Sequence, residues 1–336
     1  MEENNIKNPS VKKFQFRNFK SLRDLTLKDC KRINLLIGRP NVGKSNLLEA
    51  LSLFDIPYLT TQNTGDLRQL VRANHAAELF YDGNMGQRIE IIADEHLRIN
   101  IDRTVQEGIA ATIHQETDGI NKRYEFSKDM KMTSQPDNHV EDAIVLSYHY
   151  DATCQRTSYG TPQLIPPTGM NLMEVVKQLP VLRDDISSMM NSYGLKMVYD
   201  SASQELKAMK EKSGEIFLIP FNSLADSLQR MIFYQAAIMS NHGKVICMEE
   251  PEAHTFPPYI SAVVQDIIDS NDNQFFISTH SPYIANALME SANEDVAIYF
   301  VNMINGETIV KRVGEADIQE MLENGVDLFY NLETYL

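Results

Sequence analysis

The chain has 336 residues, of which 31 are Lys or Arg and 46 are Asp or Glu, so its formal net charge is −15 at pH 7. With 43% apolar and 23% charged residues it has the composition of a globular protein, and its length allows one large or two small domains. These values exclude a disulfide-stapled miniprotein, and the surplus of carboxylates counts against a chain whose main task is to wrap nucleic acid.

Neither a zinc site nor a membrane segment is expected. The cysteines Cys30, Cys154 and Cys247 lie far apart and form no C-x-x-C pair. Residues 1–8 are polar, and no stretch approaches the roughly 18 apolar residues of a membrane span. We therefore expect a cytoplasmic protein without a membrane partner.

The N-terminal part of the chain predicts two strands and a helix. Phe14–Phe19 alternates apolar and polar residues like a half-buried strand, and Ile33–Ile37 is a short apolar run that ends at Gly38. After Ser45, apolar residues recur at helical spacing until Pro57 closes the pattern. The predicted order is strand, glycine-containing loop and helix.

The remaining elements predict an α/β fold. Residues 88–103 alternate in the manner of an antiparallel hairpin, and residues 171–193 predict two short helices interrupted at Pro180. Three short apolar runs, the first two separated by a helical pattern over residues 260–268, predict a parallel sheet. These runs are residues 244–248, 274–278 and 297–301.

The segment from Gly38 to Ser45 reads G-x-x-x-x-G-K-S and lies between a predicted strand and a predicted helix. Its glycines let consecutive backbone N–H groups turn toward one phosphate, and the helix N-terminus adds the positive end of its dipole. We expect Lys44 to reach the β- and γ-phosphates of ATP and to act in catalysis, and the Ser45 hydroxyl to ligate Mg²⁺. The residues expected to bind the nucleotide are Gly38, Asn41, Val42, Gly43, Lys44, Ser45 and Asn46.

Two carboxylates follow the predicted strand at residues 244–248. Parallel sheets bind ligands at the carboxyl ends of their strands, so Glu249 and Glu250 are expected to face the phosphate loop. We assign Glu249 to the metal ion and Glu250 to the attacking water, as general base or orienting group. An exposed acidic turn after a core strand is the alternative.

His280 follows the predicted strand at residues 274–278, within the segment Ser278-Thr-His-Ser-Pro282. A histidine at this edge can hydrogen-bond a γ-phosphate, and its ordinary pKa lies near neutrality. We expect His280 to act in catalysis; a purely structural histidine is the alternative.

Four segments together resemble the ABC-class P-loop ATPases of the SMC, RecF and overcoming-lysogenisation (OLD) group, and most of all the AAA-family ATPases of bacterial antiviral defence. The segments are residues 16–22, 38–45, 248–254 and 278–282. The resemblance implies an ABC-ATPase head, in which a P-loop NTPase mixed sheet carries an antiparallel flank and a helical lobe. Only 56 residues follow His280, too few for the Toprim nuclease domain that OLD nucleases append.

The resemblance also implies a homodimer or higher homo-oligomer that sandwiches ATP and Mg²⁺ between one subunit's phosphate loop and the other subunit's signature motif. If residues 224–227 are laid over the family's L-S-x-G, Ala225 replaces the phosphate-binding serine and Ser227 replaces the glycine. Ser227 is then the residue expected to contact ATP, and the departure weakens the expectation of fast hydrolysis. The alternative is an ordinary helix start with Asn222 or Ser223 as N-cap.

We expect one ATPase head over residues 1–336. Within it, the expected parts are a nucleotide-binding core (1–60 and 215–310), an antiparallel β-rich part (61–150), a helical insertion (151–214) and a C-terminal tail (311–336). The apolar residues of 171–193 are a candidate docking surface, with an ordinary core as the alternative.

The leading hypothesis for function is an ATPase, with slow turnover as one option, that acts as a sensor and switch for a separately encoded nuclease or toxin in antiphage defence. One alternative is a RecF-like DNA-binding ATPase of recombination or repair, for which the densest basic stretch, residues 12–23, would contact phosphates. The other is a scaffold that holds ATP without turnover and restrains a toxin.

Overall fold

The computed structural model of the chain describes residues 11–61, 65–116, 119–136, 143–154, 157, 160–200, 202–203, 205–324 and 328–329. The chain divides into two compact units. Unit 1 comprises Met1–Ser147, Gly243–Glu250 and Asp272–Leu336, and unit 2 comprises Tyr148–His242 and Pro251–Asn271.

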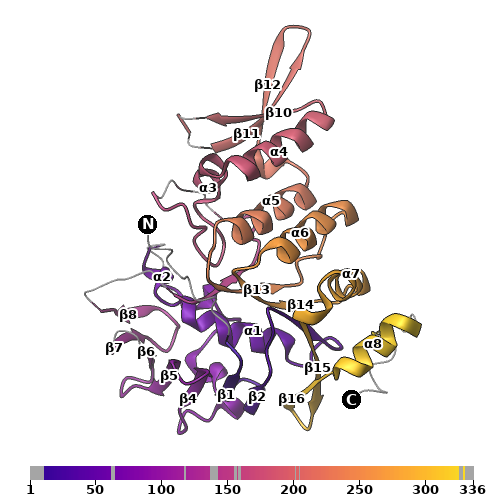
Figure 1. The fold of residues 1–336 in the computed structure, drawn as a ribbon. Helices are drawn as coiled ribbons and strands as arrows, with labels where there is room; N and C mark the ends of the chain where they lie inside the picture. The colour runs from indigo at the N-terminus through magenta and orange to yellow at the C-terminus, as the bar shows by residue number, and fades with distance from the viewer. Residues whose placement is uncertain are drawn as a thin grey trace, which may run out of the picture. The chain divides into compact units, whose positions relative to one another are not determined.

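Unit 1 contains a six-stranded mixed sheet with the strand order β16-β15-β3-β14-β13-β9 (Figure 1). Strands β15, β3, β14 and β13 run parallel, whereas β16 returns antiparallel to β15. The parallel strands are mostly buried and apolar, as in sheets covered on both faces, which confirms the predicted strands. The bounds are β3 (Ile33–Ile37), β9 (Val145–Tyr148), β13 (Val245–Glu249), β14 (Gln274–Ser278), β15 (Val296–Ile304) and β16 (Glu307–Arg312).

The second sheet of unit 1 has seven strands in the order β2-β1-β4-β5-β6-β7-β8, and neighbouring strands in it pair antiparallel. The predicted hairpin is confirmed as β4 and β5, while β2, β6, β7 and β8 were not resolved from the sequence pattern. The bounds are β1 (Phe14–Phe19), β2 (Leu22–Leu27), β4 (Ile89–Ala93), β5 (Leu97–Arg103), β6 (Ile109–Gln115), β7 (Ile120–Phe126) and β8 (Met132–Ser134).

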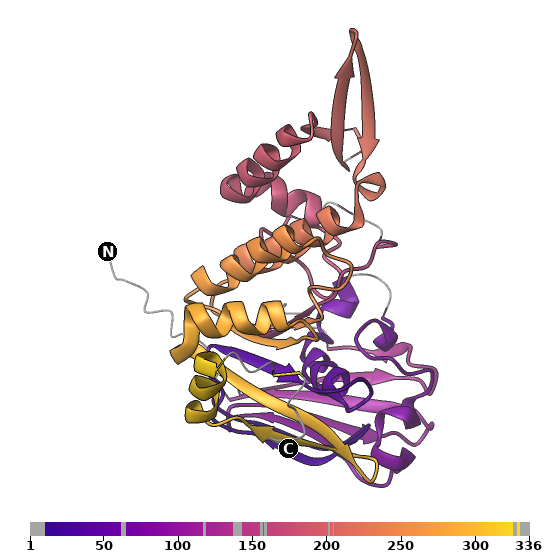
Figure 2. The ribbon, with the colours of Figure 1, turned by 90° about the vertical axis from the view of Figure 1, so that its right-hand side faces the viewer.

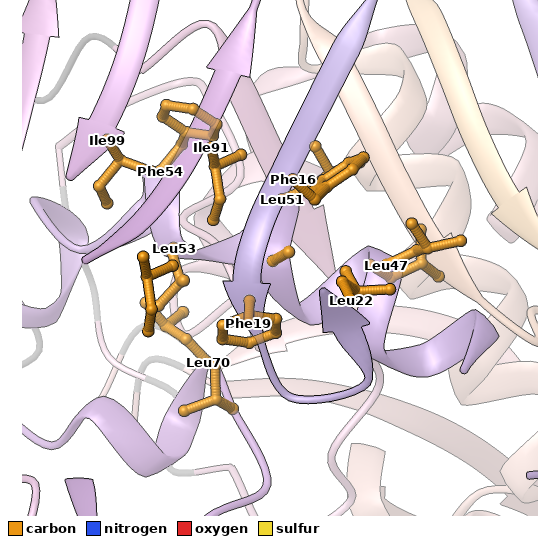
Figure 3. Close-up of a cluster of buried hydrophobic side chains, with 14 of the residues drawn as sticks. Phe16, Phe19, Leu22, Leu47, Leu51, Leu53, Phe54, Leu70, Ile91 and Ile99 are labelled. Atoms are coloured by element: carbon orange, nitrogen blue, oxygen red, sulfur yellow. The ribbon is translucent and has the colours of Figure 1, made fainter. Parts of the chain in front are cut away.

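Helix α1 (Lys44–Ser52) packs against β1 of the antiparallel sheet and against β13 and β14 of the mixed sheet, so both sheets bury its apolar face. Phe16 and Phe19 of β1 meet Leu47 and Leu51 of α1 and Ile91 of β4 in one fully buried cluster (Figure 3). Each such side chain stabilises the fold by about 1.5–3 kcal/mol. This packing holds the loop that precedes α1 at a fixed place on the mixed sheet.

Further short elements complete unit 1, and α8 packs on α7. The helices are α2 (Tyr58–Thr61), α7 (Pro282–Ala292) and α8 (Glu315–Asn324). The 3-10 turns are Leu53–Asp55, Leu67–Gln69, Ala76–Leu79, Tyr81–Gly83 and Asn293–Asp295.

The described residues of unit 2 form the helices α3 to α6 and a three-stranded antiparallel sheet, β10-β11-β12. Helices α5 and α6 pack against each other, and α3 and α4 pack on α5 (Figure 2). The α5–α6 contact includes a hydrogen bond from Gln235 Nε2 to Asp266 Oδ2 (2.9 Å). The bounds are α3 (Leu172–Gln178), α4 (Pro180–Ser192), β10 (Lys196–Asp200), β11 (Glu205–Lys212), β12 (Glu215–Pro220), the 3-10 turn Phe221–Ser223, α5 (Asp226–Met239) and α6 (Pro257–Asp269).

Two expectations for the middle of the chain need correction. The two helices predicted over residues 171–193 are confirmed, but the insertion expected to be helical also contains β10 and β11. Residues 205–208 alternate polar and apolar like a strand. The apolar residues of α3 and α4 are largely core rather than a docking surface. Buried among them are Leu172, Val175, Val176, Leu182, Ile186 and Met190.

Among the described residues, no helix is both long and apolar enough to cross a membrane.

Candidate nucleotide-binding site

The predicted site residues of unit 1 converge at one edge of the mixed sheet. Strands β3, β14 and β13 are parallel neighbours, and Ser278 of β14 lies in register with Glu249 of β13. The phosphate loop (residues 38–43) leaves β3, His280 follows β14, and Glu249 and Glu250 end β13. All three chain segments therefore emerge from the carboxyl ends of adjacent parallel strands, as the sequence predicted.

Both glycines of the phosphate loop are required by close approach of other backbone and side-chain atoms. A Cβ atom on Gly38 would lie 2.2 Å from the carbonyl oxygen of Val301. A Cβ atom on Gly43 would lie 2.0 Å from Thr308 Oγ1, and Gly43 also has a φ of +99°, which disfavours side chains. The loop is thus pressed against β15 and β16 at its two ends.

Lys44 is the first residue of α1 and is only 5% exposed. Its ammonium group donates hydrogen bonds to the carbonyl oxygens of Gly38 (2.8 Å) and Arg39 (2.9 Å). The side chain therefore folds back over the loop that precedes it, where the motif predicts that it binds phosphate.

The other predicted loop residues lie around the same turn. Val42 is buried, Asn41 is exposed with a φ of +62°, and Ser45 is partly exposed at the second position of α1. The amide of Asn46, which we expected to bind the nucleotide, instead donates a hydrogen bond to Ser21 Oγ (2.7 Å).

The predicted metal ligand Glu249 is held by a basic side chain that the sequence did not point to. Glu249 is 24% exposed and forms an ion pair with Arg72. Arg72 Nε also lies 3.3 Å from Glu49 Oε1, and Glu49 forms an ion pair with Lys20. Four alternating charges thus run from β1 through α1 to the end of β13.

Glu49 carries the sequence signal for this network. It lies in α1 between Leu48 and Leu51, and its side chain is only 8% exposed. A buried carboxylate needs cationic partners, because an unpaired buried charge is very costly. Glu49 therefore indicated that partners existed, although it could not identify Lys20 and Arg72.

The side chains of Glu250 and His280 form a second contact within the site, separate from the Arg72–Glu249 ion pair. His280 Nε2 lies 3.4 Å from Glu250 Oε1, and both side chains are partly exposed. Glu250 has a φ of +43°, a strained conformation for a residue with a side chain, and its backbone N–H donates to Ser278 O (2.9 Å). The structure thus places two of the three predicted catalytic side chains, Glu250 and His280, close together.

The donor atoms suit Mg²⁺ bound together with a nucleotide. Across the described residues there is no group of three or more His, Cys, Asp or Glu that could hold a metal ion alone. Mg²⁺ in nucleotide sites takes one or two protein oxygens and completes its shell with phosphates and water. Ser45 and Glu249, on adjacent segments of this edge, match that oxygen donor set.

Ser227 lies in unit 2, at the second position of α5. The N-cap of α5 is Ala225 and has no side-chain cap, so the alternative with Asn222 or Ser223 as N-cap is wrong. Asp226 in the first turn accepts a hydrogen bond from Arg230 Nε (2.7 Å). The start of α5 therefore carries a carboxylate and its paired guanidinium.

The basic stretch of residues 12–23 is largely compensated by acidic side chains. Arg17 pairs with Glu90 (3.0 Å), and Arg23 pairs with Glu307 (2.7 Å). Lys20 forms an ion pair with Glu49. Most of the positive charge that DNA phosphates would require is thus already paired within unit 1.

Neither a scan against protein-family models nor a search of curated proteins finds a match to this sequence. Solved structures do match. The SMC head bound to the C-winged helix domain of ScpA is 13% identical, with a TM-score of 0.55, and the match covers 92% of this chain and 99% of that chain. An SMC head with an extended coiled coil, bound to the C-terminal domain of ScpA derived from Pyrococcus furiosus, is 12% identical, with a TM-score of 0.53, and the match covers 94% and 98%. The chain therefore has the ABC-ATPase head fold of SMC proteins, as its motifs predicted.

Proposed function

We propose that this protein is a Mg²⁺-dependent, ATP-binding ATPase that closes a homodimer around the nucleotide. The observation that carries the proposal is the convergence of the phosphate loop, Glu249 and the Glu250–His280 pair at the carboxyl edge of adjacent parallel strands. This edge combines phosphate-binding backbone, metal-binding oxygens and a carboxylate for water.

The side chains of the site have separate tasks in this proposal. Lys44 exchanges its bonds to loop carbonyls for bonds to the β- and γ-phosphates, while the N-terminus of α1 adds its dipole. Ser45 and Glu249 hold Mg²⁺, which neutralises phosphate charge when it is bound. Glu250 orients the attacking water and accepts its proton, and His280 positions the Glu250 carboxylate.

Arg72 competes with the metal ion for Glu249. A carboxylate oxygen that pairs with a guanidinium must give up that contact before it can bind Mg²⁺ directly. If Glu249 coordinated Mg²⁺ directly, the Arg72 guanidinium would lose this partner and would be available for other anionic groups. Glu49 stays paired with Lys20 during this exchange, so the buried charge remains compensated.

ATP acts as a switch only to the extent that it binds the closed dimer more tightly than the open form. We propose that Ser227 and the N-terminus of α5 from a second copy complete the site at the γ-phosphate. Ala225 and Ser227 replace the serine and the glycine of the usual signature, which favours slow turnover.

We further propose that the closed dimer controls a separately encoded effector, a nuclease or toxin, in antiphage defence. The two solved SMC heads are each bound to a domain of another protein, ScpA, which supports a protein partner for a head of this fold. The altered signature at Ala225 also favours a second candidate, a scaffold that holds ATP with little or no hydrolysis. The compensated charges of residues 12–23 disfavour the RecF-like DNA-binding alternative.

The test uses Glu250→Gln, with the exposed Glu290→Gln on α7 as a matched control. With ATP and Mg²⁺, light scattering should find the Glu250→Gln protein as a stable dimer and the control as largely monomer after turnover. A Glu250→Gln protein that hydrolyses ATP at the wild-type rate would contradict the catalytic assignment.

The effector is tested by recovering the trapped Glu250→Gln dimer from its native host and identifying bound proteins by mass spectrometry. A stoichiometric nuclease or toxin supports control of an effector. Recovery of DNA with repair proteins would favour the RecF-like function instead.

A further inference from the structure

Thr308 of β16 contacts the phosphate loop although it lies 266 residues away from Val42 in the chain. Its side chain is buried, and the residue is only 4% exposed. Thr308 Oγ1 donates a hydrogen bond to the carbonyl oxygen of Val42 (3.0 Å) and lies 2.6 Å from Ser21 Oγ. The Thr308 N–H also donates to the carbonyl oxygen of Ser21 (2.9 Å), which fixes the two residues together.

The direction of these hydrogen bonds follows from counting hydrogens. A hydroxyl group has one hydrogen to donate, and Thr308 uses it on Val42. Ser21 must therefore donate to Thr308, and its own oxygen accepts from Asn46 Nδ2 (2.7 Å). One directed chain runs from Asn46 through Ser21 and Thr308 to Val42.

This chain joins the two sides of the loop's critical turn. Val42 precedes Gly43, Lys44 and Ser45, and Asn46 follows them in the first turn of α1. The hydroxyl chain therefore spans the three residues that the motif assigns to the phosphates and the metal ion.

The bond to Val42 also sets the direction of a backbone donor. In a trans peptide the C=O and the following N–H point in opposite directions. Because Thr308 holds the Val42 carbonyl toward β16, the N–H of Gly43 points away from β16. Phosphate loops bind anions through backbone N–H groups in this orientation.

We propose that Thr308 is a positioning residue for phosphate binding, which fixes the Val42–Gly43 peptide so that its N–H faces the β-phosphate. The inference rests on the proposed ATP-binding function. Close packing supports the role, since a Cβ atom on Gly43 would lie 3.0 Å from the Thr308 Cβ. The branched side chain restricts χ1 of Thr308, which keeps the hydroxyl oxygen within hydrogen-bond distance of the Val42 carbonyl.

The test compares Thr308→Val, which keeps the shape and removes the hydroxyl, with Thr308→Ser, which keeps the hydroxyl. Calorimetry measures the binding of ATP and of tripolyphosphate, which has the phosphates without the nucleoside. We expect Thr308→Val to bind both ligands about tenfold more weakly, equivalent to about 1.4 kcal/mol. Thr308→Ser should stay within about threefold of the wild type, because it restores the donor.

Four results separate the possibilities. Wild-type affinity in a folded Thr308→Val protein would overturn the inference, and so would an equal loss in Thr308→Ser, which would indicate a packing role. If Thr308→Val does not fold, Ser21→Ala breaks the same chain and should weaken tripolyphosphate binding; unchanged binding there would also overturn it. If instead Lys44→Ala binds ATP as the wild type does, the proposed function fails, whatever Thr308 does.

A double-mutant cycle measures whether the two hydroxyls act as one chain. Ser21→Ala and Thr308→Val should each weaken tripolyphosphate binding, and the double variant should lose little more than the stronger single variant. Fully additive losses would contradict a shared chain.

Discussion

The carboxyl group of Asp55 is fully buried in unit 1, and burial raises its pKa well above the ordinary value. One carboxyl oxygen accepts a hydrogen bond from the Ser147 N–H (2.8 Å), which opposes the effect but does not outweigh it. Burial also raises the pKa of the neighbouring Cys247 thiol. Asp55 therefore holds a proton in the folded chain at pH values where the unfolded chain has lost it.

The sign of the pH dependence follows from this difference. The pKa of Asp55 in the folded chain lies above its pKa of about 3.9 in the unfolded chain. The contribution of Asp55 to the free energy of unfolding is therefore complete below a pH of about 3.9 and is lost as the pH rises above it. The free energy of unfolding falls by about 1.4 kcal/mol per pH unit until the folded pKa is reached. Asn cannot ionise and its amide oxygen can still accept the Ser147 N–H, so Asp55→Asn should remove this slope.

Denaturant unfolding of the wild type and Asp55→Asn at pH 5, 6 and 7 measures the effect. The free energy of unfolding of the variant should rise relative to that of the wild type as the pH increases from 5 to 7, by at most about 1.4 kcal/mol per pH unit. A difference that stays constant across these pH values would refute the reasoning.

Asp66 provides a control of opposite sign. Partial burial acts to raise its pKa, but hydrogen bonds from Arg68 and Lys131 outweigh burial and lower the pKa to about 2. The stabilising contribution of Asp66 is therefore present above the pKa of the unfolded chain and is lost as the pH falls toward 2. Asp66→Asn should therefore leave the slope between pH 5 and pH 7 unchanged.

Two further predictions concern the candidate site. Arg72→Gln removes the ion pair with Glu249, which contributes about 1 kcal/mol because the Arg72 side chain is 65% exposed. In a Mg²⁺ titration at fixed ATP, half-maximal binding should therefore occur at about fivefold lower Mg²⁺ concentration. An unchanged Mg²⁺ concentration at half-maximal binding would exclude competition between Arg72 and the metal ion. Gly38→Ala forces a Cβ atom against the Val301 carbonyl and should lower stability by about 1–3 kcal/mol in thermal melts. Gly160→Ala, where a Cβ atom would meet nothing within 4 Å, should be nearly neutral; equal melting of both variants would contradict the steric assignment.

Local patterns were sufficient to predict the core of the site. The phosphate loop begins at Gly38, directly after one short apolar run, and Glu249 directly follows another. Runs of this kind become neighbouring parallel strands in α/β folds. The carboxyl-edge rule then brings their loops together without any knowledge of tertiary contacts.

The partners of these residues could not be predicted, because they come from distant segments without a local signature. Arg72 lies 177 residues before Glu249 in the chain, and Thr308 lies 266 residues after Val42. An arginine after a 3-10 turn and a threonine in a hairpin strand have many ordinary structural explanations. Only the buried Glu49 indicated that charged partners were missing.

Unit 2 was harder to predict for a related reason. Strands β11 and β12 are largely exposed, so their pattern lacks the buried runs that mark the strands of unit 1. Their pairing is local, but its signal is weak beside the strong helical pattern of α3 and α4. The helices were therefore predicted and the sheet was not.

The most direct test of the account is a calorimetric titration of Mg²⁺-ATP into the wild-type protein and into Lys44→Ala. The ammonium group of Lys44 already lies over the phosphate loop, and we expect it to bind the β- and γ-phosphates. The account predicts saturable binding near one ATP per chain in the wild type and no measurable binding in a folded Lys44→Ala protein. Equal binding by both proteins, or none by the wild type, would contradict it.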